Sequence, residues 1–94
     1  MCDKKTKLLK PIVTACGDKP QMLQSIEELS ELQKAICKYL KSPKEETKEA
    51  ITEEMADVSI MLDQLMIIFD NEQEMQQVVA QKIDRTYKRL GIDK

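Results

Sequence analysis

The sequence predicts an all-α fold: an antiparallel bundle of three long helices with a short N-terminal helix, completed by oligomerisation. Gly and Pro are scarce, Trp is absent, and Leu, Ile, Met, Glu, Lys and Gln dominate, a balance that favours helix over strand. Apolar residues recur at the spacing of amphipathic helices, and capping motifs divide the chain. The 94 residues are expected to form a single domain, 1–94, whose modest core favours self-association.

The first two helices are predicted from one proline and one capping motif. Residues 4–15 predict a weaker helix, disturbed or restarted at Pro11. Asp18 and Gln21 form an N-terminal capping box, which predicts the first long helix at about 19–41. The apolar stripe of this helix consists of Met22, Ile26, Leu29, Ile36 and Leu40, with Leu32 beside them.

The middle helix is predicted from "SPKE" at residues 42–45, a capping box with proline at the first helical position. The motif predicts a helix at about 43–70. A separate short turn followed by a restart near Thr47 is the alternative. On a wheel of 100° per residue, the apolar stripe consists of Ile51, Met55, Val58, Leu62, Leu65 and Phe69.

The last helix is predicted at about 72–90, between the capping box "NEQE" at residues 71–74 and the stop signal Gly91. Its stripe consists of Met75, Val79, Ile83 and Leu90, with Lys82 and Arg89 alongside and Arg85 at the flank. These cations suit a phosphate ligand. They also suit the negative end of a helix dipole, which is the alternative explanation.

Two carboxylates interrupt the stripe of the middle helix. Glu54 falls at about 300° on the wheel, between Met61 at about 280° and Leu65 at about 320°. Asp57 falls at about 240°, on the edge of the stripe. A lone buried carboxylate is so costly that it neutralises, pairs or binds a metal. An ion pair of Glu54 with Lys or Arg and a metal site both remain open.

The first long helix carries a matching pair, Glu28 and Glu31, with the same i, i+3 spacing as Glu54 and Asp57. If the two helices pack antiparallel through their stripes, four acids meet at one seam. Ligation by carboxylates alone indicates Mg²⁺ or Mn²⁺, which in such clusters usually serve phosphate chemistry. His is absent, which argues against a di-iron carboxylate site and a zinc hydrolase. The remaining acids are expected to be solvated, namely Glu27, Glu45, Glu46, Glu49 and Glu53.

Composition argues against several other classes of protein. The net charge of −2 does not indicate a surface that binds nucleic acid. The chain has three cysteines, Cys2, Cys16 and Cys37, and no CxxC pair. The sequence therefore predicts neither a disulfide framework nor a zinc site. A location in a reducing cytoplasm is expected. The longest apolar run, residues 59–69, is interrupted by Asp63 and is too short to span a bilayer.

Together these motifs carry a family resemblance. "EELSE" at 27–31 matches an EExxE pattern, and "EMAD" at 54–57 matches ExxD, with a gap of suitable length. With their flanks "SIEELSELQKAI", "EEMADVSIMLDQL" and "KIDRTYKRL", they resemble the MazG-like, all-α nucleotide pyrophosphohydrolases, in particular small phage-type members. This superfamily includes dimeric dUTPases and phosphoribosyl-ATP pyrophosphohydrolases. The resemblance covers residues 8–91.

The resemblance implies a set of site residues. Glu28, Glu31, Glu54 and Asp57 would be the catalytic Mg²⁺ ligands, and Glu27 would lie beside them. Lys82 and Arg89, with Arg85 as a further contact, would bind substrate phosphates. Two positions depart from the family pattern: Thr86 replaces a frequent Asn, and no Trp precedes Gly17.

The implied reaction converts an NTP or dNTP and water into NMP and pyrophosphate, clearing non-standard or surplus nucleotides. The resemblance implies a homodimer or homotetramer, and Ile60 and Ile67 form a second apolar line that a small monomer would leave uncovered. A non-enzymatic helical interaction module and a narrower phosphoribosyl-ATP-type enzyme are the alternatives. No residue set indicates which nucleobase is preferred.

Overall fold

The computed structural model describes residues 3–93, and within this range the chain is all-helical without a strand. The helices are α1 (Asp3–Cys16), α2 (Asp18–Lys41), α3 (Glu45–Phe69) and α4 (Glu72–Leu90). The predicted all-α class, with three long helices after a shorter one, is therefore confirmed. Cys2 lies outside the described residues.

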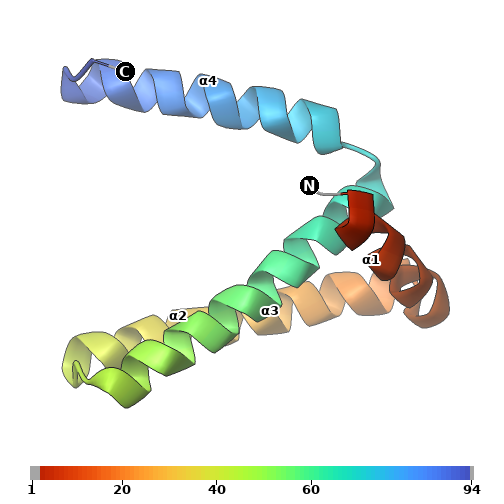
Figure 1. Cartoon of the computed structure of the whole chain (residues 1–94), viewed down its shortest axis with the longest axis horizontal. Coiled ribbons are helices and arrows are strands. Elements are labelled where there is room, and N and C mark those ends of the chain that lie inside the picture. Colours follow the sequence, from red (N-terminus) through yellow and green to blue (C-terminus); the bar gives the residue numbers. More distant parts are fainter. Residues whose placement is uncertain (1–2, 94) are drawn as a thin grey trace.

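The helices form a packed part and an extended arm (Figure 1). α2 and α3 run antiparallel along each other, and α1 packs against both of them near the α2 N-terminus and the α3 C-terminus. α4 leads away from this group, and none of its residues is buried. A single chain therefore contains part of a helical bundle, and α4 does not close it.

α1 and the start of α2 each differ from the prediction in one way. α1 continues through Pro11 without a restart. The residue before α2 is Gly17, so Asp18 belongs to the helix and the predicted Asp18 cap is wrong. The Gly17 N–H donates to the Val13 carbonyl at 2.8 Å. Gly17 has φ +94° and ψ 154°, a region that is essentially reserved for glycine.

α3 begins later than the first prediction, at Glu45 with Lys44 as its N-cap. Ser42 instead ends α2, where its N–H donates to the Lys38 carbonyl at 2.9 Å. The Thr47 hydroxyl accepts the Lys44 N–H at 3.1 Å and donates to the Ser42 carbonyl at 2.9 Å. The predicted Ser42 cap is thus wrong, and the helix begins between the predicted start at about 43 and the alternative start near Thr47.

The boundaries of α4 agree with the prediction. Asn71 occupies the N-cap position, although its side chain makes no capping hydrogen bond. Gly91 ends the helix with φ +69°, and the N–H of Ile92 donates to the Tyr87 carbonyl at 3.1 Å. A glycine in the left-handed conformation, followed by this hydrogen bond across six residues, is the Schellman motif, which commonly ends helices.

α2 contributes small and polar residues to its seam with α3, whereas the buried apolar residues of α3 are Val58 and Met61. Ser25 and Ala35 are the buried residues of α2, and Gln21 donates from Nε2 to Oε1 of Gln64 at 2.7 Å. Gln64 is 2% exposed. These side chains let the helices approach closely, but they leave the bulky stripe of α2 outside the seam.

Much of the predicted apolar core is therefore exposed in the single chain. The buried apolar residues are Leu9, Val13, Ala35, Val58 and Met61. The exposed stripe residues of α2 are Met22, Ile26, Leu29, Ile36 and Leu40, and those of α3 are Met55, Leu62 and Phe69. The whole predicted stripe of α4 is exposed as well. Within the described residues, no helix is long and apolar enough to cross a membrane.

Candidate metal centre

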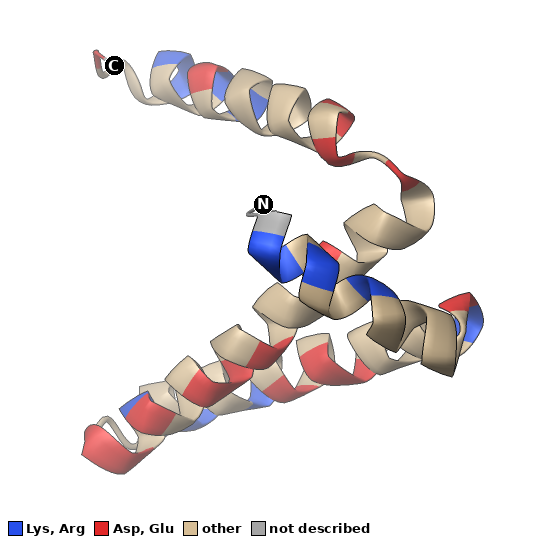
Figure 2. Cartoon of the chain, turned by 45° about the vertical axis from the view of Figure 1, so that its right-hand side comes forward, with Lys and Arg blue, Asp and Glu red and all other residues tan. Residues whose placement is uncertain are grey.

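Three carboxylates converge where α2 and α3 run side by side. Glu28 comes from α2, and Glu54 and Asp57 come from successive turns of α3. One carboxylate oxygen of each lies within 4.8 Å of the others. Figure 2 shows acidic residues along the paired helices, where basic residues also occur, and further basic residues on α1 and toward the end of α4. The antiparallel pairing thus produces the carboxylate cluster.

The spacing of this cluster, defined as Glu28, Glu54 and Asp57, suits a small hard cation. Mg²⁺ binds oxygen at about 2.1 Å, so two ligands on opposite sides of the ion are about 4.2 Å apart. The three oxygens all lie within 4.8 Å of one another, which is the range of separations that ligands of one such ion have. The donor set contains only carboxylate oxygens, as Mg²⁺ and Mn²⁺ prefer.

Two carboxylates of the cluster, Glu28 and Glu54, have raised pKa values. The pKa of Glu28 is raised, first by partial desolvation at the seam, then by a hydrogen bond with Asp57 and by the charges of Asp57, Glu54 and Glu27. The pKa of Glu54 is raised by desolvation and by the charges of Asp57, Glu31 and Glu53. The cluster therefore favours added positive charge, either a proton or a cation.

Glu31, the fourth predicted ligand, lies next to the cluster and is not part of it. Its charge raises the pKa of Glu54, but its Oε1 faces Lys34 Nζ at 3.4 Å. The sequence did not single out Lys34, although an i, i+3 spacing from an acid is a recognisable ion-pair pattern. The structure thus brings together three of the four predicted acids, with the fourth one turn along α2.

Glu27 is exposed and acts on the cluster through its charge on Glu28. Gln24, one turn before Glu28, donates from Nε2 to the Glu28 carboxylate at 3.4 Å. Sequence reasoning missed this contact, because an exposed glutamine on a helix carries no distinctive signal.

The predicted phosphate-binding residues lie elsewhere in the chain. Lys82, Arg85 and Arg89 are exposed on α4, and α4 extends away from the α2–α3 pair (Figure 1). The Thr86 hydroxyl donates to the Lys82 carbonyl within α4 at 2.8 Å. The structure of one chain therefore does not bring these cations to the carboxylate cluster.

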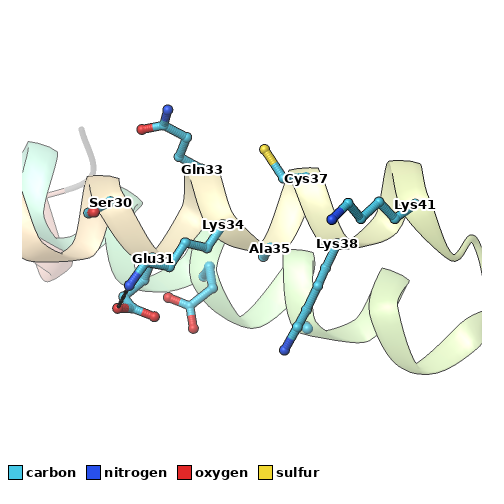
Figure 3. A pocket seen from close by; sticks show the side chains of 10 residues that line it. Ser30, Glu31, Gln33, Lys34, Ala35, Cys37, Lys38 and Lys41 are labelled. Atoms are coloured by element: carbon cyan, nitrogen blue, oxygen red, sulfur yellow. Dashed lines mark hydrogen bonds and ion pairs between the residues drawn. The ribbon is translucent and has the colours of Figure 1, made fainter.

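A hollow of about 670 Å³ adjoins the carboxylates. Its walls include Glu31, Lys34 and Lys38 from α2 and Glu54 from α3, with Ala35 and Ala50 among them. Figure 3 shows the Lys34 side chain beside Glu31, and Lys38 extending from α2 across α3. Gln33 and Cys37 point to the opposite side of α2. The hollow thus has both acidic and basic side chains in its walls, and Lys34 and Glu31 lie in contact.

Comparisons of the chain with protein-family models, with curated proteins and with solved structures give no match.

Proposed function

We propose that this chain is a Mg²⁺-dependent nucleoside triphosphate pyrophosphohydrolase. It would convert an NTP or dNTP and water into NMP and pyrophosphate, and so clear non-standard or surplus nucleotides. The observation that carries the proposal is the convergence of Glu28, Glu54 and Asp57 from two helices. The motif resemblance of the same residues supplies the reaction class.

The cluster fits the implied cation in number, spacing and chemistry of its donors. Glu28, Glu54 and Asp57 would hold Mg²⁺, whereas Glu31 acts on Glu54 through its charge and pairs with Lys34. Bound Mg²⁺ supplies charge for the phosphate oxygens and makes water a better nucleophile at neutral pH. The carboxylates would orient this water, and one of their oxygens would accept its proton.

Direct attack by water fits the surrounding side chains better than a covalent intermediate. Ser59, the nearest hydroxyl along α3, accepts a hydrogen bond from Lys5 Nζ at 3.1 Å on the side of α1. Cys37 points away from the acidic side of α2 in Figure 3. We propose that the oxygen that joins the α-phosphorus comes from water rather than from Ser30 or Cys37, which also line the adjoining hollow.

The proposal includes a homodimer or homotetramer. The apolar stripes of α2 and α4 are exposed in one chain, and large uncovered apolar patches are rare on monomers. A second copy that covers these stripes would bring its α4 toward the cluster. Lys82 and Arg89, with Arg85 at the flank, would then contact substrate phosphates from the partner. A reducing cytoplasm suits the exposed free thiols of Cys16 and Cys37.

The test is hydrolysis of a panel of NTPs and dNTPs by the purified protein, with Mg²⁺ or with EDTA. We expect NMP and pyrophosphate in the presence of Mg²⁺ only. Glu54→Gln should lower the rate by at least about 100-fold, with helix content unchanged. Glu49→Gln, an exposed acid on the same helix, is the matched control. Release of orthophosphate and NDP, or full activity of Glu54→Gln, would contradict the proposal.

A non-enzymatic helical interaction module is the second candidate, and the exposed apolar stripes favour it. Such a module would release no pyrophosphate from any substrate in the panel. Including phosphoribosyl-ATP in the panel separates the broad enzyme from the narrower one.

A further inference from the structure

The hollow beside the carboxylates offers cations that the proposed reaction has not used. Lys34 and Lys38 lie one turn apart on α2 and both line it, on the side where Glu31 and Glu54 also lie. Ala35 and Ala50 contribute only methyl groups to the same walls, which keeps the space between the helices open. A ligand can therefore contact the acids and the lysines at the same time.

Both ammonium groups are available to a ligand. The Lys34 side chain is 71% exposed, and its contact with Glu31 is 3.4 Å long, so little energy holds it there. Among residues 3–93, Lys38 forms no ion pair with a carboxylate. Figure 3 shows its side chain crossing toward α3 instead of following its own helix.

Helix-dipole compensation explains only one of these cations. Lys38 lies in the last turn of α2, where positive charge is favourable. Lys34 lies about two turns before the end of the helix, beyond the range of that effect. The ion pair with Glu31 accounts for its place beside the acids, and its exposed side chain leaves the ammonium group able to contact a ligand as well.

We propose that Lys34 and Lys38 bind the terminal phosphates of a nucleoside triphosphate whose α-phosphate lies at the carboxylate cluster. This inference rests on the proposed function and adds a phosphate-binding wall within the same chain. Along α2, Lys34 is about 9 Å and Lys38 about 15 Å beyond Glu28, and flexible lysine side chains shorten both gaps. Since a diphosphate would reach this wall less well, the lysines favour triphosphates over diphosphates.

The experiment compares wild type with Lys34→Ala/Lys38→Ala for hydrolysis of an NTP and of the corresponding NDP. We expect KM for the NTP to rise about tenfold or more while kcat changes little, and the NTP:NDP ratio of kcat/KM to fall about tenfold. Lys34→Arg/Lys38→Arg should retain most of the preference. Lys19→Ala, an exposed lysine in the first turn of α2, is the matched control. An unchanged ratio, or a loss of kcat with unchanged KM, would overturn the inference.

A binding measurement separates this inference from the proposed function. Inorganic tripolyphosphate is titrated calorimetrically into wild type and into both double variants with Mg²⁺ present. If the wild type hydrolyses NTPs but Lys34→Ala/Lys38→Ala binds tripolyphosphate equally well, only the lysine wall is wrong. If no NTP is hydrolysed, the proposed function is wrong. Lysine-dependent tripolyphosphate binding would then still support the phosphate site, and its absence would overturn that site too.

Discussion

The α2–α3 pair and α4 carry similar amphipathic patterns but are used differently in the single chain. α2 and α3 meet through Ser25, Ala35 and the hydrogen-bonded pair Gln21–Gln64, and this seam holds the carboxylate cluster. α4 has an apolar stripe and basic side chains, yet buries no residue. A helical stripe thus predicts that a face will be covered, but it does not say whether the same chain or another copy covers it.

The largest expected effect tests whether α4 acts on the cluster of another chain. Glu54→Gln and Arg89→Ala should each lose most activity alone. If Arg89 reaches a partner's cluster, a mixture of the two variants forms hybrid dimers in which one site has intact acids and an intact arginine. Steady-state pyrophosphate release should then recover to about a quarter of wild type, because half of the dimers are hybrids with one working site.

A mixture of Glu54→Gln with Asp57→Asn provides the control for this complementation. Both substitutions damage the cluster of their own chain, so no hybrid site is intact and activity should stay low. If Glu54→Gln mixed with Arg89→Ala behaves like this control, α4 does not serve a partner's site.

The second effect concerns the stripe of α4 and the assembly. Val79 and Ile83 are 42% and 46% exposed in the chain, and we expect a second copy to cover them. Val79→Asp or Ile83→Asp should weaken association by about 1.5–3 kcal/mol or more. Sedimentation at micromolar concentration should show a dimer or tetramer for wild type and a smaller species for the variants.

Gln77→Asp is the matched control, since Gln77 lies about 160° from Val79 around the helix and is exposed. A wild-type protein that is folded, active and monomeric at that concentration would rule out a site shared between chains.

Part of this contrast was predictable from the sequence. The helices, their order and the stop at Gly91 follow from local patterns that the structure preserves. The apolar stripe of α2 led to a wrong prediction of the face that packs against α3. A helical wheel favours the face with the largest apolar side chains, whereas α3 packs against the face that carries the small residues Ser25 and Ala35. The acids Glu28, Glu54 and Asp57 lie at the margin of that seam and so come together regardless. The placement of α4 depends on contacts beyond one helix, which local patterns do not encode.

A smaller effect is expected where α1 joins the packed part. Lys5 forms an ion pair with Asp63, which is 8% exposed, and donates to Ser59 at 3.1 Å. Lys5→Ala leaves the Asp63 carboxylate without its cation. Because Lys5 is itself 39% exposed, the cost is discounted for solvent to about 1–2 kcal/mol. Urea unfolding should show this loss, and Lys4→Ala, an exposed neighbour, should not.

The smallest effect is the pH dependence of the metal-free protein. The pKa values of Glu28 and Glu54 are raised in the fold, so the folded state binds these protons more tightly than the unfolded state. Their contribution to stability therefore falls as pH rises from the ordinary carboxyl range through the raised values. Glu54→Gln removes one of these groups and also relieves the repulsion on Glu28.

The Tm difference between Glu54→Gln and wild type isolates this term, because the other carboxyl groups titrate in both proteins. In EDTA the Tm of the variant should increase relative to the Tm of the wild type as pH rises from about 4.5 to about 7.5. With Mg²⁺ the order should reverse at neutral pH, since the cation stabilises only the ionised cluster of the wild type. A difference that does not change with pH would show that the pKa of Glu54 is not raised in the fold. A pH-dependent difference that Mg²⁺ leaves unchanged would support the raised pKa, which desolvation and the other acids cause together, and would rule out the metal site.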